Sequence, residues 1–490
     1  MSAHRTTLAD MLAAGARHLV AVVAGVVTIG LVARRLGPDA LGAWALLGTA
    51  SFLLGVTDLG LSAAVQRAAA RPEVEPARRL VGLALLVVAT LAPLAACLSL
   101  GFLLDVPGAA PALRADVARA GAVAMSAGVV GALAFPFRSF ALVRGGMRCL
   151  AEARAASSAA QVVVTATWLS LRPTLLAPAV GLLVAALIET ALTVRAARRI
   201  DRGLPLVPAL PGSLRELAAP LRDGAASLAI NLFTLAAVRA DVLVLAHVAP
   251  LSVVAGYGVG ARAVDQSFTF AKQVSAALLP RLGDPATRDG AVRLGTAVLG
   301  VLVTSGIAAL AFDGAGLLTA WAGAVAAQRE TALALALLGS AAVFAAAHEV
   351  AASTLLLGGR TAWASAAPII AGSLLNVTAL LALARAGGVW AAAGSTLLGN
   401  ALTTVLVWSK ARRLLRWSAR DVASALAPMA AAGAASLSVG WALADRGAAS
   451  LAGSAAACML TTATGLAAGA WVALRRPTRA VGLAGGAGVP

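Results

Sequence analysis

The stretch RADVLVLAHVAPLSVVAGYGVGARAVDQSFTFAK, residues 239–272, combines two long apolar segments with charged side chains. Each segment belongs to a run long enough to cross a lipid bilayer. The second segment carries Arg262, Asp265, Thr269 and Lys272 at steps of three, four and three residues. On an α-helix this spacing places the four side chains on one continuous stripe. We therefore predict a membrane helix with a polar face, which is a costly exception in so apolar a chain.

The whole chain is apolar in composition. It has 490 residues, of which 60% are hydrophobic and 12% charged, and its mean hydropathy is +0.89. A soluble protein would carry about twice that charged fraction, and its helices would need one polar face. We predict an all-α integral membrane protein with about fourteen transmembrane helices. The predicted spans are 10–33, 41–66, 80–104, 117–143, 151–171, 174–195, 218–246, 252–279, 291–312, 331–357, 362–385, 389–409, 421–443 and 448–474.

The net charge of +18 comes mainly from arginines at the ends of the apolar segments. This placement indicates membrane topology and not a nucleic-acid partner. Most of these arginines fall on the side that also holds both termini, although Arg34 and Arg35 lie on the opposite side. The positive-inside rule therefore predicts a multi-pass protein of the cytoplasmic membrane with both termini cytoplasmic.

Several kinds of site are disfavoured by the motifs that the chain lacks. Cys97, Cys149 and Cys458 form no C-x-x-C pair, so neither a disulfide framework nor a zinc site is indicated. His348-Glu349 begins the zinc-protease motif, but the second histidine does not follow. Neither lysine belongs to a P-loop. We predict no metal, no cofactor and no nucleotide hydrolysis through a P-loop.

The best domain boundary is ARRIDRGLPLVPALPGSLRE, residues 197–216, which is rich in proline and arginine and divides six spans from eight. A weak similarity between the ends of spans one and seven is consistent with a parallel internal repeat. The predicted organisation is an N-terminal six-helix bundle (1–200), a cytoplasmic linker (201–216), a C-terminal six-helix bundle (217–413), and two extra transmembrane helices with a cytoplasmic tail (414–490).

The run ARRLGPDALGAWALLGTASFLLGVTDLGL, Ala33 to Leu61, resembles the opening of the polysaccharide-export flippases. That family opens with an Arg-x-Leu-Gly-Pro turn, a glycine and an aromatic residue, and a later Asp-x-Gly. The matching residues are Arg35, Leu36, Gly37, Pro38, Gly42, Trp44, Asp58 and Gly60. In the second half Asp241, Gly256-Tyr257 and Ala277-Leu-Leu-Pro280 are similar to further landmarks of the family.

The resemblance implies the fold of the multidrug/oligosaccharidyl-lipid/polysaccharide (MOP) exporters, a superfamily that includes the MATE transporters. Two six-helix bundles would face each other across a central cavity that opens alternately to either side. The implied substrates are sugars carried on a polyprenyl pyrophosphate. Spans thirteen and fourteen would be additions to the twelve-span core, as in the lipid II flippases of the same superfamily.

Ionisable residues inside predicted spans are the candidate site, because each buried charge costs about 2.5–3.5 kcal/mol and is expected to pair or to face a cavity. Arginine suits phosphate because its fork binds two oxygens at once. The predicted substrate-binding cations are Arg17, Arg138, Arg239, Arg262 and Lys272. Charge pairing or ion coupling is predicted for Asp58, Asp241, Asp265, His348 and Glu349, and Glu189 is a further intramembrane acid.

Two geometric expectations follow from the spacing. Arg262 and Asp265 are three residues apart on one face, so they can form an ion pair. The stripe is expected to face Arg17 and Asp58 across a cavity that both halves share. Structural alternatives remain open: the charges would only lock helices together, Arg17 and Arg138 would snorkel to the surface, and Asp58 would orient a break at Gly60.

We predict an alternating-access flippase that moves polyprenyl-pyrophosphate-linked oligosaccharide for polysaccharide or cell-envelope biosynthesis. Its predicted partners are that glycan, membrane lipid and polysaccharide-assembly proteins. The alternative is a MATE-like drug/cation antiporter, since basic residues only slightly outnumber acidic ones inside the spans. A membrane glycosyltransferase or polymerase generally needs a long outer loop with catalytic groups. The longest outer connection, 313–330, carries few charges, so the chain is not expected to be an enzyme.

Overall fold

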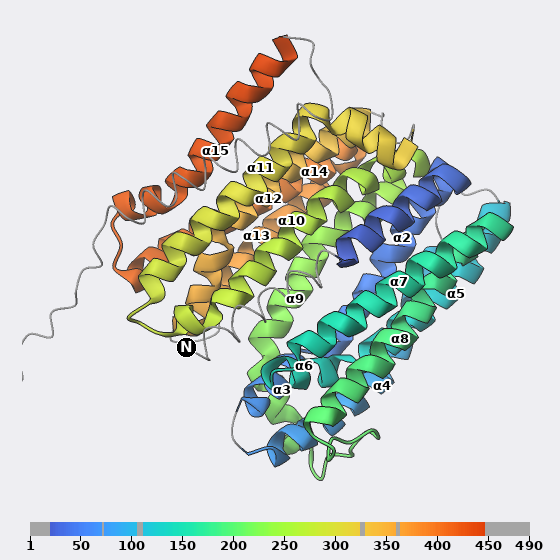
Figure 1. The fold of residues 1–490 in the computed structure, drawn as a ribbon, viewed down its shortest axis with the longest axis vertical. Helices are drawn as coiled ribbons and strands as arrows, with labels where there is room; N and C mark the ends of the chain where they lie inside the picture. Colours follow the sequence, from blue (N-terminus) through green and yellow to red (C-terminus); the bar gives the residue numbers. More distant parts are fainter. Residues whose placement is uncertain (1–19, 71–72, 105–110, 324–328, 359–362, 446–490) are drawn as a thin grey trace, which may run out of the picture.

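A computed structural model describes residues 20–445 apart from 71–72, 105–110, 324–328 and 359–362. Throughout this described part the regular structure is helical, and it contains no strand (Figure 1). The predicted span 448–474 lies outside the described residues.

Residues 20–36 form a helix that turns at Gly37 into the first of the labelled elements. The order is then α2 (Pro38–Leu53), η1 (Leu54–Asp58), α3 (Leu61–Ala69), α4 (Glu75–Leu104), α5 (Pro111–Leu133), α6 (Phe135–Val143), α7 (Met147–Leu171), α8 (Leu176–Ile200), α9 (Leu214–Val248), α10 (Leu251–Gly283), α11 (Arg288–Ala322), α12 (Arg329–Gly358), α13 (Trp363–Gly387), α14 (Val389–Leu415) and α15 (Ala419–Asp445).

Eight helices of the described part are long and apolar enough to cross a membrane, judged by length and composition. They include α4, the α5–α6 pair, α8, α12, α13 and α14, together with most of α9 and the first part of α11. The chain is therefore an all-helical, multi-pass membrane protein. The count of about fourteen spans and the limits of the four predicted domains stay predictions.

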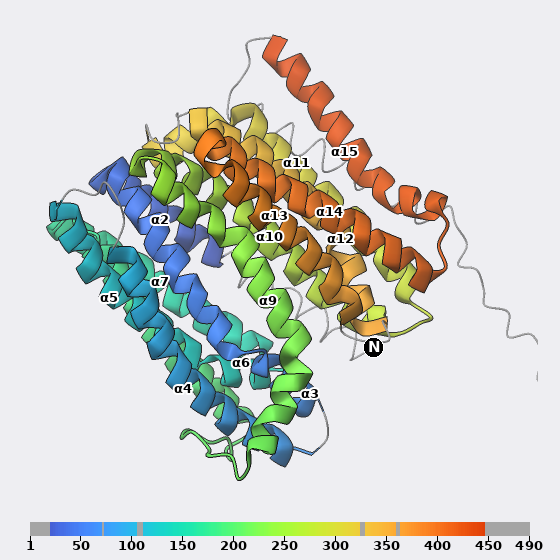
Figure 2. The same ribbon diagram turned by 180° about the vertical axis from the view of Figure 1, so that it is seen from behind.

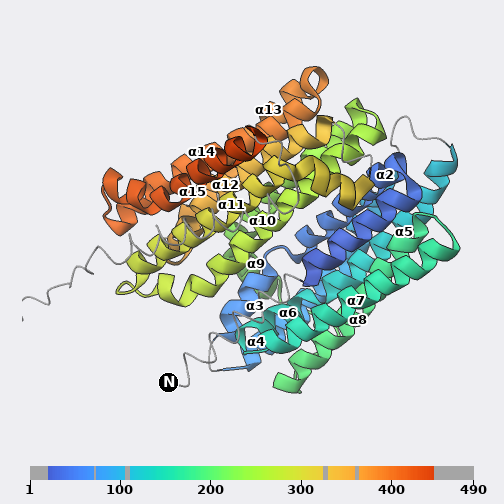
Figure 3. The same cartoon turned by 45° about the horizontal axis from the view of Figure 1, so that its top comes forward.

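The helices associate as two groups (Figures 1 and 3). Helices α2 to α8 form one group and α9 to α14 form the other, while α15 lies outside against α11. Helix α2 lies at the junction and packs on α10 more extensively than on any helix of its own group. We call these the N-terminal and C-terminal helix groups. The connection 201–213 lies at one end of the molecule, which we call the linker end, and the turns that lead into α2 and α10 lie at the far end (Figure 2). Helix α9 runs along the junction and contacts helices of both groups.

Two spans that look continuous in the sequence are broken in the structure. The predicted span 41–66 divides into α2, η1 and α3, and the predicted span 117–143 divides into α5 and α6. At the first break, α2 passes into η1, after which Leu59 and Gly60 have φ angles of 48° and 78° that end the helical run. The Asp58 carboxylate accepts hydrogen bonds from the Ser62 N–H (3.0 Å) and hydroxyl (2.9 Å), which satisfies the start of α3. The second break directly precedes Pro136, near the start of α6.

Glycines bring the two helix groups into backbone contact near both ends. A Cβ on Gly60 would lie 2.5 Å from the Gly224 carbonyl oxygen, and a Cβ on Gly224 would lie 2.7 Å from the Gly60 carbonyl oxygen. Toward the far end, a Cβ on Gly42 would collide with the Leu251 carbonyl oxygen. Only residues without a side chain allow α3 to approach α9, and α2 to approach α10, this closely.

Gly60→Ala is expected to destabilise the protein by roughly 1–3 kcal/mol, because it adds a Cβ at positive φ and against backbone. The midpoint of thermal unfolding in detergent should fall. Gly25→Ala is the control, since a Cβ there would meet nothing within 4 Å. Equal midpoints for the two variants would contradict the glycine contact.

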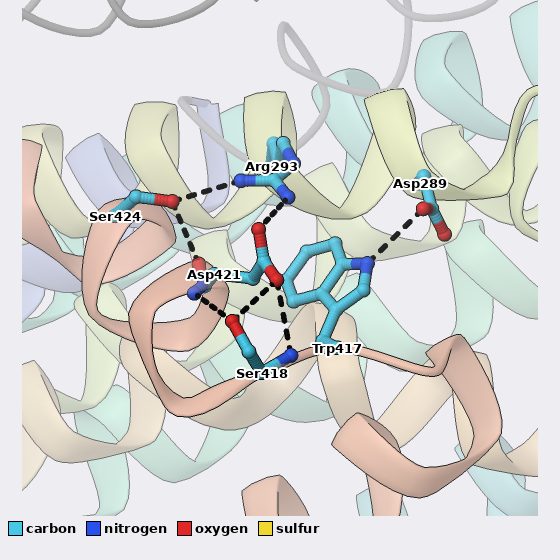
Figure 4. A network of polar contacts seen from close by, with 6 residues as sticks. All are labelled: Asp289, Arg293, Trp417, Ser418, Asp421 and Ser424. Atoms are coloured by element: carbon cyan, nitrogen blue, oxygen red, sulfur yellow. Dashed lines mark hydrogen bonds and ion pairs between the residues drawn. The ribbon is translucent and has the colours of Figure 1, made fainter. Parts of the chain in front are cut away.

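A polar network at the linker end fastens α15 to α11 (Figure 4). The Arg293 guanidinium donates to the Ser424 hydroxyl (2.8 Å) and to the Asp421 carboxylate (3.0 Å), and it stacks 4.3 Å from the centre of the Trp417 ring. The Trp417 indole N–H donates to Asp289 at 3.0 Å. Asp421 also accepts from the Ser418 N–H and hydroxyl, in the manner of a capping box at the start of α15. One arginine thus joins the end of the α14–α15 turn to α11.

Asp421→Asn is expected to cost roughly 1–2 kcal/mol, since it removes the partner of Arg293 and weakens the start of α15. The test is the rate at which a protease cleaves near α15 in the purified protein. Arg148→Gln is the matched control, because its ion pair with Glu152 is exposed and is expected to contribute little. Cleavage of both variants at the wild-type rate would contradict the anchoring role.

Candidate functional site

A cavity of about 460 Å³ lies inside the C-terminal helix group, between α9, α10, α12, α13 and α14. Among the described residues, Gly55 of η1 is the single lining residue from the N-terminal group. The charged and titratable lining residues are Arg239, Asp265, Lys272, His348 and Glu349. Neutral polar groups complete the lining: Asn231, Thr234, Thr269, Ser353, Ser365, Ser373, Asn376, Asn400 and Thr403. Nearly all of the described lining thus comes from one helix group, and the sharing of a cavity between both halves stays a prediction.

Arg239 and Asp265 form the ion pair at the far-end side of the cavity. The Arg239 Nη2 lies 3.0 Å from the Asp265 Oδ2, and both side chains are largely buried. Asp265 thus pairs with Arg239 and not with Arg262, the partner that the spacing allowed. Spacing along one helix favoured Arg262, but α9 packs beside α10 and brings a second arginine to the same carboxylate. The contact joins two helices, which a pair within α10 would not do.

Arg262 does not line the cavity, although it lies on the same helix as Asp265. Its guanidinium rests against Gly48 of α2, where a Cβ would collide with the Nη2 atom. Its other neighbours are mostly apolar and include Ile29 and Trp44. Among the described residues it forms no hydrogen bond and no ion pair. The predicted stripe therefore divides: Asp265, Thr269 and Lys272 face the cavity, and Arg262 faces the N-terminal helix group.

Lys272 and Glu349 face the same cavity from α10 and α12. Glu349 lies within electrostatic reach of Lys272. In the described part of the chain no hydrogen bond or ion pair joins either side chain to another residue. Nearby, the Ser275 hydroxyl donates to the Ser353 hydroxyl at 2.7 Å and joins the same two helices. The cavity thus holds one ion pair, one cation and one acid that has no direct partner.

His348 is held by Thr404 on α14, with 2.9 Å between Nδ1 and the threonine Oγ1. The Thr404 hydroxyl also lies 3.0 Å from the Phe344 carbonyl oxygen and 2.8 Å from the Asn400 carbonyl oxygen. A hydroxyl has one proton, so Thr404 donates to a carbonyl and accepts from the Nδ1–H of the neutral imidazole. In this tautomer Nε2 is the ring atom that is left to accept a proton or a hydrogen bond.

The other predicted site residues make local contacts away from the cavity. The buried Asp241 carboxylate accepts from the Tyr257 hydroxyl and joins α9 to α10. Asp58 caps α3, as one of the structural alternatives proposed. Arg138 donates to Glu189 at 2.9 Å, and Arg154 donates to the same carboxylate at 2.7 Å. Arg17 lies outside the described residues.

Sequence reasoning missed the neutral polar residues of the cavity. Asn376 is buried between helices and donates to the Ala237 carbonyl oxygen at 2.7 Å. Asn400 on α14 donates to the Thr396 carbonyl oxygen at 2.9 Å, one turn earlier on its own helix. An asparagine inside an apolar span was the available signal, because unsatisfied amides are costly in lipid. Charge alone gave no reason to select it.

Comparison with solved structures identifies the fold of the chain. No family model and no curated protein matches the chain. Among solved structures, the lipid II flippase MurJ in an inward closed conformation matches with a TM-score of 0.68 and 11% identity, over 95% of this chain and 98% of that chain. The eukaryotic MATE transporter AtDTX14 matches with a TM-score of 0.63 and 15% identity, over 84% of this chain and 99% of that chain.

A mutant of the Vibrio cholerae MATE transporter VcmN is also similar, with a TM-score of 0.61 and 15% identity over 85% of this chain and 98% of that chain. A further match is described as a MATE family transporter of the MOP superfamily. The chain therefore has the fold of these proteins, as the resemblance implied. Identities of 11–15% show the fold and do not show a substrate.

Asp265→Asn is expected to remove the carboxylate that pairs with Arg239 and to cost roughly 1–3 kcal/mol, less than for a fully buried pair because the cavity admits water. The double variant Arg239→Gln with Asp265→Asn should regain part of that loss. Thermal unfolding of the wild type, both single variants and the double variant forms a double-mutant cycle. A coupling energy of zero would show that the two side chains do not interact.

Proposed function

We propose that the chain is a flippase that moves a polyprenyl-pyrophosphate-linked oligosaccharide across the cytoplasmic membrane by alternating access. The observation that carries the proposal is the state of its intramembrane cations. Arg138 and Arg239 have carboxylate partners, whereas Arg262 and Lys272 form no hydrogen bond or ion pair with any described residue. A cation held in an apolar protein without a counter-charge is costly. A pyrophosphate of the substrate would supply the missing partner.

The two unpaired cations are too far apart for one phosphate group. Ten residues of α10 separate Arg262 from Lys272, which corresponds to about 15 Å along the helix axis. Arg262 lies toward the far end, beside the N-terminal helix group, and Lys272 faces the cavity nearer the linker end. The proposed function assigns them to successive positions of the pyrophosphate. Arg17, Arg138 and Arg239 remain proposed contacts along the same route.

The match to MurJ supports this choice of substrate class. That protein is named as a flippase of lipid II, and the match extends over 95% of this chain, compared with 84% for AtDTX14. We also propose a role in polysaccharide assembly, cytoplasmic positions for both termini and fourteen membrane spans. The proposed domain limits are 1–200, 201–216, 217–413 and 414–490. Transport, and no enzymatic reaction, is the activity proposed.

Two titratable residues that line the cavity, His348 and Glu349, are assigned to coupling. Glu349 faces Lys272 across the cavity, and His348 has an acceptor nitrogen left over, so protonation of either would change the charge of the cavity. Asp265 forms an ion pair with Arg239. Asp58 caps the start of α3, and Asp241 accepts a hydrogen bond from Tyr257. We propose that His348 and Glu349 respond to the coupling ion, and that the other three maintain the pairing around them.

A drug/cation antiporter of the same fold is the second candidate. One observation favours it: the cavity lining holds two cations, Arg239 and Lys272, and two carboxylates, Asp265 and Glu349. Balanced charge would accept a cationic drug as readily as an anion. Proteoliposomes separate the two candidates. We expect movement of a polyprenyl pyrophosphate that carries a fluorescent sugar, read by quenching from outside, and no uptake of ethidium. The opposite result would replace the flippase with the antiporter.

Lys272→Ala is expected to lower flipping of the fluorescent lipid at least tenfold, because it removes a cation that faces the cavity. Lys410 provides a matched control, since it is the other lysine of the chain and does not line the cavity. Lys410→Ala should retain activity. Arg262→Ala should also abolish flipping, and Arg262→Lys should restore part of it, since lysine keeps the charge without the fork. Normal flipping by both alanine variants would refute the cationic path.

A further inference from the structure

The connection between the two helix groups is fastened along the start of α4. Asp201 is the first residue of the connection, and its carboxylate accepts two hydrogen bonds from the Arg78 guanidinium of α4, at 2.7 and 2.8 Å. Beyond its end, Glu216 accepts from Arg79. Between them, the Ala209 N–H donates to the Gly82 carbonyl oxygen at 3.0 Å. The Arg78 hydrogen bonds hold the pKa of Asp201 below its usual range, so this fastening is present at neutral pH.

The fastened segment covers the side of α4 that faces outward. Gly82 is seven residues beyond Glu75, so the segment reaches about 10 Å along α4. A Cβ on Gly82 would lie 2.6 Å from the Ala209 Cβ, so the glycine permits this close approach. On the same helix face, Pro93 and Cys97 are exposed on the surface of an apolar span. The segment therefore lies on a surface that continues into the lipid-facing side of the span.

The segment presents apolar side chains on its outer side. Leu206, Val207 and Leu210 are 53%, 73% and 83% exposed, whereas Leu204 is buried in the core beneath. The sequence LPLVPALP, residues 204–211, contains no charge. Three apolar side chains that extend from one short loop are an unusual surface for water and a suitable one for a lipid interface.

A basic rim adjoins these apolar side chains. Arg198, Arg199 and Arg202 are exposed at the end of α8 and the start of the connection. In the described part of the chain none of the three forms an ion pair, and the neighbouring acid Asp201 is already bound to Arg78. A surface that combines apolar tips with unpaired cations matches an anionic bilayer surface, in which acyl chains lie beneath negative head groups.

We propose that residues 204–211 form a lipid wedge, in which Leu206, Val207 and Leu210 insert into the leaflet at the linker end while Arg198, Arg199 and Arg202 bind anionic head groups. The partner is the bilayer itself, independent of any transported substrate. The wedge would hold the connection against the N-terminal helix group at the point where α9 leaves for the C-terminal group (Figures 1 and 2).

Spin-label depth measurement tests the wedge without any transport assay. Cys97, Cys149 and Cys458 are replaced with serine, and a nitroxide is attached at Val207→Cys in the full-length protein. The control label is at Ser213→Cys, which is exposed and lies just beyond the apolar segment. In vesicles with anionic phosphatidylglycerol, the label at 207 should lie about 5–10 Å below the phosphates and be more accessible to oxygen than to a water-soluble nickel complex. The label at 213 should show the opposite preference.

Lipid composition tests the basic rim. In vesicles of zwitterionic phosphatidylcholine alone, the label at 207 should become several-fold more accessible to the nickel complex. Replacing Arg198, Arg199 and Arg202 with glutamine should remove this difference between lipids, with the label at 213 unchanged. If the rim variant kept the full dependence on lipid, the head-group assignment would be wrong.

Two results would overturn the wedge as a whole. Equal, high accessibility of both labels to the nickel complex would place the segment in water. Protection of the label at 207 from both oxygen and nickel would indicate that protein covers it, either a partner or a second copy. Neither result depends on flipping, so the wedge and the proposed transport function fail separately.

Discussion

The cost of placing a charge in lipid is the constraint on which this structure depends. Glu189 receives both Arg138 and Arg154, Arg239 is held by Asp265, and Asp241 accepts from Tyr257. These contacts join α8 to α6 and α7, and α9 to α10, so neutralising a charge also fixes how the helices pack. The intramembrane charges are therefore part of the architecture before they are part of any transport path.

Among the described residues, two intramembrane cations without a hydrogen bond or ion pair, Arg262 and Lys272, differ from these pairs. Arg262 is placed between helix groups by the glycine at position 48, and Lys272 is placed in a cavity opposite Glu349. Their different surroundings have different consequences. Movement of α2 relative to α10 would change the environment of Arg262 directly, whereas Lys272 lies within one helix group and would keep its neighbours through such a movement.

The contacts between the helix groups suit a protein that alternates between conformations. They are made by backbone at Gly60 and Gly224, by glycines along α2, and by the Trp321 indole N–H, which donates to the Val26 carbonyl oxygen at 2.6 Å. Among the described residues, the ion pair that crosses the junction is Arg79 with Glu216, near the linker end. Along the rest of the junction these contacts leave little electrostatic attraction to be broken when the groups separate. The stronger ion pairs lie within groups, or between the connection and α4.

The sequence by itself determined the membrane class, the helical fold and the candidate charges, because apolar length and the cost of buried charge are properties of the local chain. Only the tertiary structure decided which charges meet. Asp265 has Arg262 one turn away but pairs with Arg239 of α9, and the stripe on α10 divides between a cavity and the opposite helix group. Periodicity predicts which residues share a helix face. It does not predict which neighbouring helix approaches that face at each turn. Helix α9 directly precedes α10 and α2 lies far earlier in the chain, and only the folded structure brings them to different parts of α10.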